Sequence, residues 1–175
     1  MAPLVAVLEA ELIASGSATY DGKMIAMNEA SADRQAVLGD FQIAYDFTGD
    51  LDATGQIDNL IFADRSDIDD ATDQITIPNE AELTGMAGSF DISGLGIAAD
   101  ETTTLLVSTI DGSFVLPDSL NTLSAGPVDV AVQGSLLMVP TGDQLVGGSG
   151  LIFIRTEPTP ALNVWGGQMY GVKDD

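Results

Sequence analysis

The stretch from Val37 to Phe47 reads Val-Leu-Gly-Asp-Phe-Gln-Ile-Ala-Tyr-Asp-Phe and holds the clearest periodic pattern in the chain. Large apolar side chains stand at every second position, at Phe41, Ile43, Tyr45 and Phe47, with polar or small residues between them. Successive side chains of a strand point to opposite faces, so this period of two predicts a strand with all four residues on one buried face.

On both sides of this stretch, short apolar runs alternate with Gly, Asp and Pro along most of the chain. Strands separated by such turn residues are typical of antiparallel barrels and sandwiches. We therefore expect an all-β fold, a single antiparallel β-barrel of about eight strands or a sandwich. The further expected strands are 18–27 (broken by a turn at Asp21-Gly22), 56–62, 85–97, 102–110, 128–139, 151–154 and 164–172, with a rigid crossing at 155–161.

The first residues differ from the rest and predict a separate element. Residues 1–15 are expected to form a docking arm or short helix, and residues 16–175 the barrel domain. The segment has no Lys or Arg and contains two Glu, so it does not resemble a secretory signal. Its apolar side chains would be exposed in an isolated chain, which predicts that they either plug or cap the barrel or dock on a partner chain, and we favour docking. These partner-docking residues are Leu4, Val5, Leu8, Leu12 and Ile13.

The formal net charge is −22, from 27 acidic and 5 basic residues. Such a surface repels nucleic acid and anionic membranes, so neither is an expected partner. It suits a cationic partner, bound cations or a salty medium, and composition does not separate these. No apolar run approaches the roughly 18 residues that a membrane-spanning helix requires.

The chain contains no Cys and no His. Thiol nucleophiles, His-based triads, imidazole bases and zinc sites of the usual ligands are therefore excluded. The only amines on side chains are Lys23 and Lys173, and neither lies in the apolar surroundings that activate a Lys nucleophile. We expect a protein with no catalytic activity and no cofactor.

The segment from Asp50 to Ile61 partly matches a calcium-binding loop, with Asp50, Asp52, Thr54 and Gly55 at the expected positions. The bidentate Glu of such loops is replaced by Ile61, and the preceding strand pattern does not fit a flanking helix. We expect a β-hairpin connection with no metal site. A second acidic cluster, at 64–73, is irregular and predicts a solvated loop that binds calcium weakly at most.

Several of these segments resemble a known family. Gly16–Gly22, Gly39–Phe47 and Gly55–Leu60 resemble the opening strands of the transferrin-binding-protein-B-like β-barrels, and 85–94 and 146–153 resemble their later strands. The resemblance implies an eight-stranded barrel beside a membrane surface that binds a host protein or a solute. The chain lacks the lipid-anchor Cys of that pattern.

Two functions are expected from these features. The first is a structural component on the surface of a large assembly, such as a decoration protein of a phage-like virion, in contact with other protein chains of an oligomer. The alternative is a binding barrel for a host protein or small solute at a bacterial cell surface or in the periplasm. The unsignalled apolar arm and the missing catalytic residues favour the first.

Overall fold

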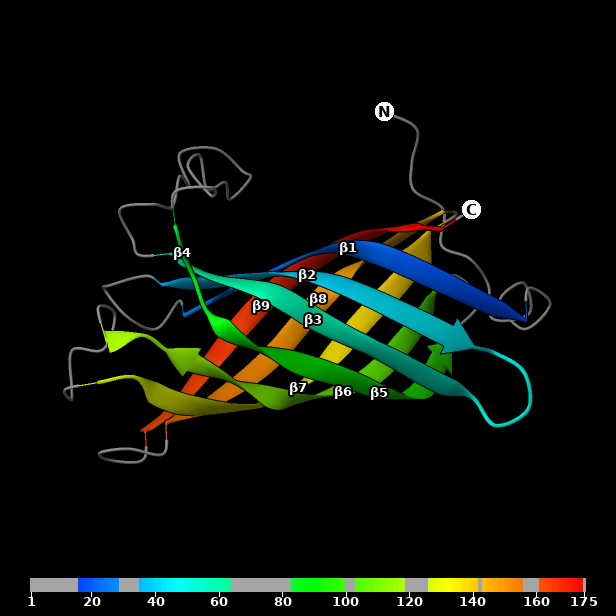
Figure 1. Cartoon of the computed structure of the whole chain (residues 1–175). Coiled ribbons are helices and arrows are strands. Elements are labelled where there is room, and N and C mark those ends of the chain that lie inside the picture. The colour runs from blue at the N-terminus through cyan, green and yellow to red at the C-terminus, as the bar shows by residue number, and fades with distance from the viewer. Residues whose placement is uncertain are drawn as a thin grey trace.

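The computed structural model describes residues 16–28, 35–63, 83–99, 103–118, 126–141, 143–155 and 161–174. These ranges consist almost entirely of strands (Figure 1). The predicted arm, the crossing at 155–161 and the acidic cluster at 64–73 lie wholly or mostly outside them. The strands are β1 (Ser17–Met27), β2 (Ala36–Asp46), β3 (Asp52–Ala63), β4 (Thr84–Gly85), β5 (Ala87–Ala99), β6 (Thr104–Leu116), β7 (Val128–Thr141), β8 (Gln144–Arg155) and β9 (Ala161–Lys173).

Eight of the strands form a closed antiparallel barrel, which confirms the barrel prediction and excludes the sandwich. Each barrel strand pairs with the next along the chain, and β1 pairs with β9 to close the sheet. The two-residue strand β4 adds to β3 outside this ring. In Figure 1 the strands β1, β2, β3 and β5 cross in front of β7, β8 and β9.

The register shows how strongly the strands are staggered. A row of paired residues that begins at Asp21 on β1 runs through six further strands and reaches Val164 on β9. Asp21 itself pairs with Val172 of β9, eight residues further along that strand. A stagger of this size in an eight-stranded barrel corresponds to a strand tilt of about 36° and leaves an interior that side chains fill.

The four alternating residues of β2 and its end all point into the barrel. Phe41, Ile43, Tyr45 and Phe47 are at most 3% exposed, which confirms that they share one buried face. The aromatic rings of the interior form two groups in edge or stacked contact, one of Tyr20, Tyr45 and Phe47 and the other of Phe90, Phe114, Phe153 and Trp165. This packed interior is the main hydrophobic core.

The turn predicted at Asp21-Gly22 is wrong, because both residues lie inside the continuous strand β1. Gly22 faces the interior, where a Cβ atom would stand 2.1 Å from the carbonyl oxygen of Tyr170 and 2.7 Å from the ring of Phe41. Gly22 therefore permits close approach of strands rather than a turn. The strand predicted at 151–154 is also longer than expected, because β8 begins at Gln144 and continues through Gly147, Gly148 and Gly150.

Two irregularities change the direction of side chains along the sheet. The register shifts between Leu38 and Asp40 opposite β3, where Asn59 adopts a φ of 50°. Asn tolerates this left-handed conformation better than most residues. The inserted residue lets both Ile57 and Leu60 point inward. Beyond the shift, a smaller apolar cluster on the outer side contains Met27, Ala36, Leu38 and Ala63.

Candidate interaction surfaces

A ladder of Asp and Gln side chains runs across the outer surface of six neighbouring strands. Its members occupy one paired row, Asp21, Gln42, Gln56, Asp91, Asp111 and Gln133 on β1, β2, β3, β5, β6 and β7. Amide groups donate to the carboxylates along it, from Gln42 to Asp21 at 2.8 Å, from Gln56 to Asp91 at 3.4 Å and from Gln133 to Asp111 at 3.5 Å. The row then continues into Ile152 of β8 and Val164 of β9.

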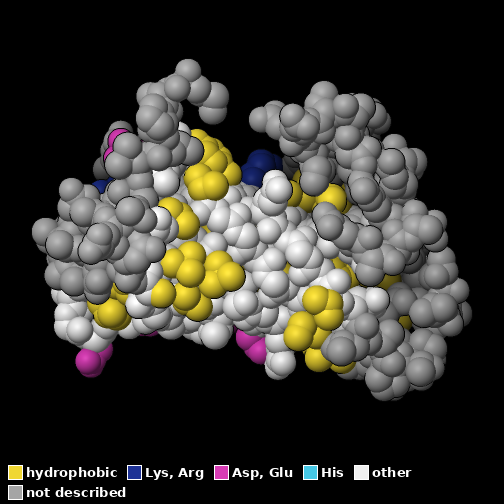
Figure 2. All heavy atoms as spheres, turned by 180° about the vertical axis from the view of Figure 1, so that it is seen from behind, with side chains coloured by type: hydrophobic (Ala, Val, Ile, Leu, Met, Phe, Trp, Pro, Cys, Tyr) yellow, Lys and Arg dark blue, Asp and Glu magenta, His cyan; other side chains and the backbone are white. Residues whose placement is uncertain are grey.

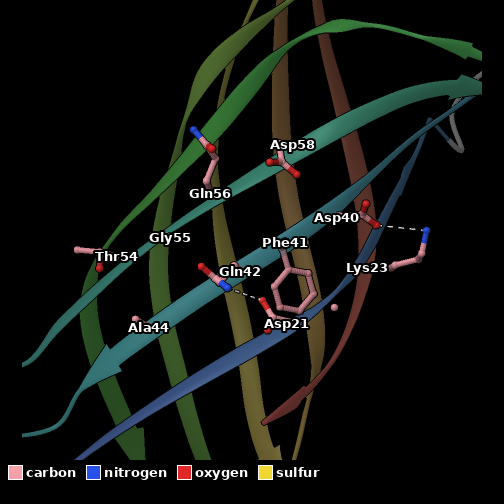
Figure 3. A pocket seen from close by; sticks show the side chains of 11 residues that line it. Asp21, Lys23, Asp40, Phe41, Gln42, Ala44, Thr54, Gly55, Gln56 and Asp58 are labelled. Atoms are coloured by element: carbon pink, nitrogen blue, oxygen red, sulfur yellow. Dashed lines mark hydrogen bonds and ion pairs between the residues drawn. The ribbon is translucent and has the colours of Figure 1, made fainter. Parts of the chain in front are cut away.

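Beside this ladder, the outer faces of β1, β2 and β3 enclose an open hollow of about 740 Å³ (Figure 3). Asp21, Lys23, Asp40, Gln42 and Asp58 stand around it. The Nζ atom of Lys23 lies 3.2 Å from a carboxylate oxygen of Asp40, and both side chains are largely exposed. An exposed pair of this kind contributes at most about 1 kcal/mol to stability.

Three pairs of Asp residues face each other directly across neighbouring strands: Asp40 with Asp58, Asp46 with Asp52, and Asp91 with Asp111. Like charges in directly opposed positions destabilise a sheet. Each pair has a compensating neighbour: Lys23 lies beside Asp40, and Gln56 and Gln133 donate to Asp91 and Asp111. Hydrogen bonds from the hydroxyl and backbone N–H of Thr48 lower the pKa of Asp46. The fold thus tolerates an unfavourable concentration of negative charge on this side of the barrel.

The partial calcium-loop pattern lies on an extended strand and the turn before it. Asp52, Thr54, Gln56 and Asp58 all point outward along β3, and Asp50 lies in the turn that joins β2 to β3. The six residue steps from Asp52 to Asp58 along the strand span roughly 20 Å, so these two carboxylates cannot share one ion. Within the described ranges, no group of three or more acidic side chains is placed to hold a metal.

The opposite side of the barrel carries a mostly apolar surface, the outer face of β7, β8 and β9, which meets the acidic side where Tyr170 and Val172 of β9 pair with Lys23 and Asp21 of β1. Of the six large hydrophobic side chains exposed in the described ranges, five belong to these strands, and the sixth is Leu51 in the β2–β3 turn. Figure 2 shows apolar side chains in separate patches across this side, with few acidic side chains in view. The five are Leu137, Ile152, Val164, Tyr170 and Val172.

Charge is nearly absent from the sequence of these three strands. They contain only Asp129, Arg155 and Lys173, each at or next to a strand end. Between the apolar side chains lie small residues without bulk. A Cβ atom on Gly166 would meet nothing within 4 Å, and one on Gly150 only the hydroxyl of Ser135 at 3.8 Å. The described barrel surface therefore has an acidic side and a mostly apolar side, which adjoin along β1 and β9.

The sequence prediction missed this division of the surface. The acidic residues and the exposed apolar residues are each spread along the chain, and only the strand register brings them together. One signal was present in the sequence, since the stretch from 128 to 154 contains only two acidic residues, Asp129 and Asp143. The predicted docking residues Leu4, Val5, Leu8, Leu12 and Ile13 lie outside the described residues.

Two tyrosines, Tyr20 and Tyr45, have their ionisable hydroxyl groups inside the apolar barrel interior. Burial raises the pKa of Tyr45, the neighbouring Tyr20 raises it further, and the approach of Ser108 offsets part of this. Burial also raises the pKa of Tyr20, with a smaller contribution from Asp143. Neither the Tyr45 hydroxyl nor that of Ser108 makes a hydrogen bond of ordinary geometry with the described residues. The phenols therefore belong to the core, protonated at neutral pH.

No helix in the described ranges is long and apolar enough to cross a membrane. Comparison of the chain with protein-family models, with curated proteins and with solved structures finds no match. The resemblance to the transferrin-binding-protein-B-like barrels therefore stays a prediction.

Proposed function

We propose that this chain is a non-catalytic structural protein that takes its place in a larger protein assembly, such as the surface of a phage-like virion. It docks on other protein chains through its mostly apolar face, and its acidic side faces the solvent. The observation that carries the proposal is the placement of five of six exposed large hydrophobic side chains on β7, β8 and β9.

Burial of this face is energetically favourable because little opposes it. Leu137, Ile152 and Val164 remain 36–66% exposed in the isolated barrel. Each large aliphatic side chain contributes roughly 1.5–3 kcal/mol when it passes from full exposure to full burial. No charged group at the centre of the face has to be desolvated, and depletion of charge is what distinguishes the cores of protein interfaces.

The charges on the acidic side support the proposal that this side faces the solvent. Carboxylates that face each other across strands, such as Asp91 and Asp111, cost stability and contribute nothing to the core. A strongly charged exposed surface keeps an assembled particle soluble and resists further association. The proposed orientation therefore explains why the two kinds of surface lie on opposite sides.

The test is the size of the species that contains the chain in its native source. Sedimentation of native material should place it in a particle-sized fraction. A variant without residues 1–14, the predicted arm, should keep the circular dichroism of a β-protein but leave that fraction. A native chain that sediments as a monomer of 18.1 kDa would contradict the proposal.

A further inference from the structure

We propose that the occupant of the apolar face is a second copy of this chain, placed so that β7, β8 and β9 of the two copies pack face to face about a two-fold axis. The inference rests on the proposed function and names the first partner of that face. The charge and the shape of the face support it, and the area of the face limits the strength of the dimer.

Charge favours this face over every other side of the barrel. Two copies each carry a net charge of −22, and contact through the Asp and Gln ladder would bring Asp91 and Asp111 of one copy against those of the other. Like charges held this close repel each other, and more strongly near a protein surface than in bulk water. The apolar face is the described surface where two copies meet without opposing carboxylates.

Charge also argues against other kinds of partner. A cationic protein would be attracted to the opposite side, where Asp21, Asp40 and Asp58 surround the hollow. An anionic protein finds no cation on the apolar face away from the strand ends. The face matches a mostly apolar surface, and the chain itself supplies one.

The shape of the face is self-complementary, because rows of bulky residues flank rows that contain small ones. Paired rows cross the three strands, and one such row contains Val146 and Tyr170 and another contains Ile152 and Val164. Between them lie two further rows: one is a strip of small residues, which pairs Ser135 with Gly150 and Gly150 with Gly166, and one pairs the exposed Leu137 with Gly148 and Gly148 with Gln168. Two-fold packing places the apolar row of each copy over the small strip of the other, as an isologous interface requires.

The available area predicts a weak dimer. Three strands about 4.8 Å apart and ten residues long cover roughly 480 Å² in projection. Stable interfaces bury about 800 Å² on each partner. The face falls well short of this size, so we expect a weak dimer, with a dissociation constant on the order of 0.1–1 mM at low salt.

Sedimentation equilibrium of the purified full chain, from about 10 µM to 1 mM, tests the inference. We expect a monomer–dimer equilibrium that strengthens from 0.05 to 1 M NaCl, because salt screens the repulsion between copies. Val164→Asp should raise the dissociation constant at least tenfold. Leu51→Asp replaces an apolar side chain of the β2–β3 turn, 38% exposed, and should leave it unchanged.

Leu137→Lys repeats the test with the opposite charge, and circular dichroism verifies that each variant is folded. Three results would overturn the inference: a monomer at every concentration and salt, a dimer that salt weakens, or equal loss of the dimer in the Val164 and Leu51 variants. A chain that is monomeric when pure but sediments with particles in native material would refute the dimer and leave the proposed function standing.

Discussion

The ring of Phe41 lies over Gly22, and its Cε1 atom occupies a point only 2.7 Å from where a Cβ atom of that residue would stand. The same ring lies 2.7 Å from the Cβ position of Gly171 on β9. Phe41 thus fills the space left by two glycines on β1 and β9, the pair of strands that closes the barrel. The core and the closure of the sheet depend on one another at this point.

Substitution of Gly22 by Ala should therefore destabilise the barrel. The added methyl group would also collide with the backbone of Tyr170 and Gly171, which cannot move as a flexible side chain does. We expect the free energy of unfolding to fall by about 1–3 kcal/mol, as for other overpacked sites. Urea denaturation followed by circular dichroism measures the change.

The matched control is Gly96→Ala on β5. The nearest atom to its Cβ position is in Val107 at 3.8 Å, which is ordinary van der Waals contact. This variant should be neutral or slightly more stable, because Ala restricts the unfolded chain. Equal destabilisation by both substitutions would show that closure of the barrel does not depend on the space beside Phe41.

High pH should unfold the protein through its buried phenols. The pKa values of Tyr20 and Tyr45 are raised in the folded state, so the fold favours their protonated forms. The stability that this contributes is complete below the unfolded pKa of about 10 and is lost as pH rises through the higher folded values. Circular dichroism between pH 8 and 12 should show this loss.

Tyr45→Phe separates the phenol from its ring. The hydroxyl makes no hydrogen bond with the described residues, so the variant should unfold at neutral pH within about 1 kcal/mol of the parent. Its alkaline transition should move to higher pH. A transition at the same pH in parent and variant would mean that Tyr45 ionisation does not drive alkaline unfolding.

Asp91→Asn should stabilise the barrel at low salt. It removes one carboxylate from the Asp91–Asp111 pair and keeps an oxygen that accepts the hydrogen bond from Gln56. We expect a gain of about 0.2–1 kcal/mol, the range measured for cross-strand pairs. The gain should shrink in 1 M NaCl, where charges on the surface are screened.

Asp21→Asn is the control for this substitution. Asp21 belongs to the same ladder and accepts a hydrogen bond from Gln42, yet its partners across the strands are Gln42 and Val172, neither of which is charged. Its effect should be smaller than that of Asp91→Asn. An equal gain from both would attribute the effect to net charge and not to the opposed pair.

Much of the fold could be predicted from the sequence because strand periodicity is local. Phe41, Ile43, Tyr45 and Phe47 reveal the buried face of β2 without knowledge of any other strand. Asp21-Gly22 misled the prediction, since the same dipeptide serves turns and close strand contacts. The choice between the two depends on the distant Phe41 and Tyr170.

The candidate surfaces could not be predicted in the same way. Asp21 and Gln133 belong to one ladder although more than a hundred residues separate them, and the barrel register alone aligns them. Ile152 and Val164 are ordinary strand residues in the sequence. They become part of one exposed apolar face because strand alternation turns both outward and the register pairs them with each other.

The most direct test of the central claim, that the β7–β9 face is covered in the native assembly, is hydroxyl-radical footprinting of native material against the dilute purified chain. Leu137, Ile152 and Tyr170 should be labelled in the dilute chain and protected in the assembly. Leu51, exposed to a similar extent in the β2–β3 turn, should be labelled equally in both. Equal labelling of Tyr170 and Ile152 in the two samples would contradict the account.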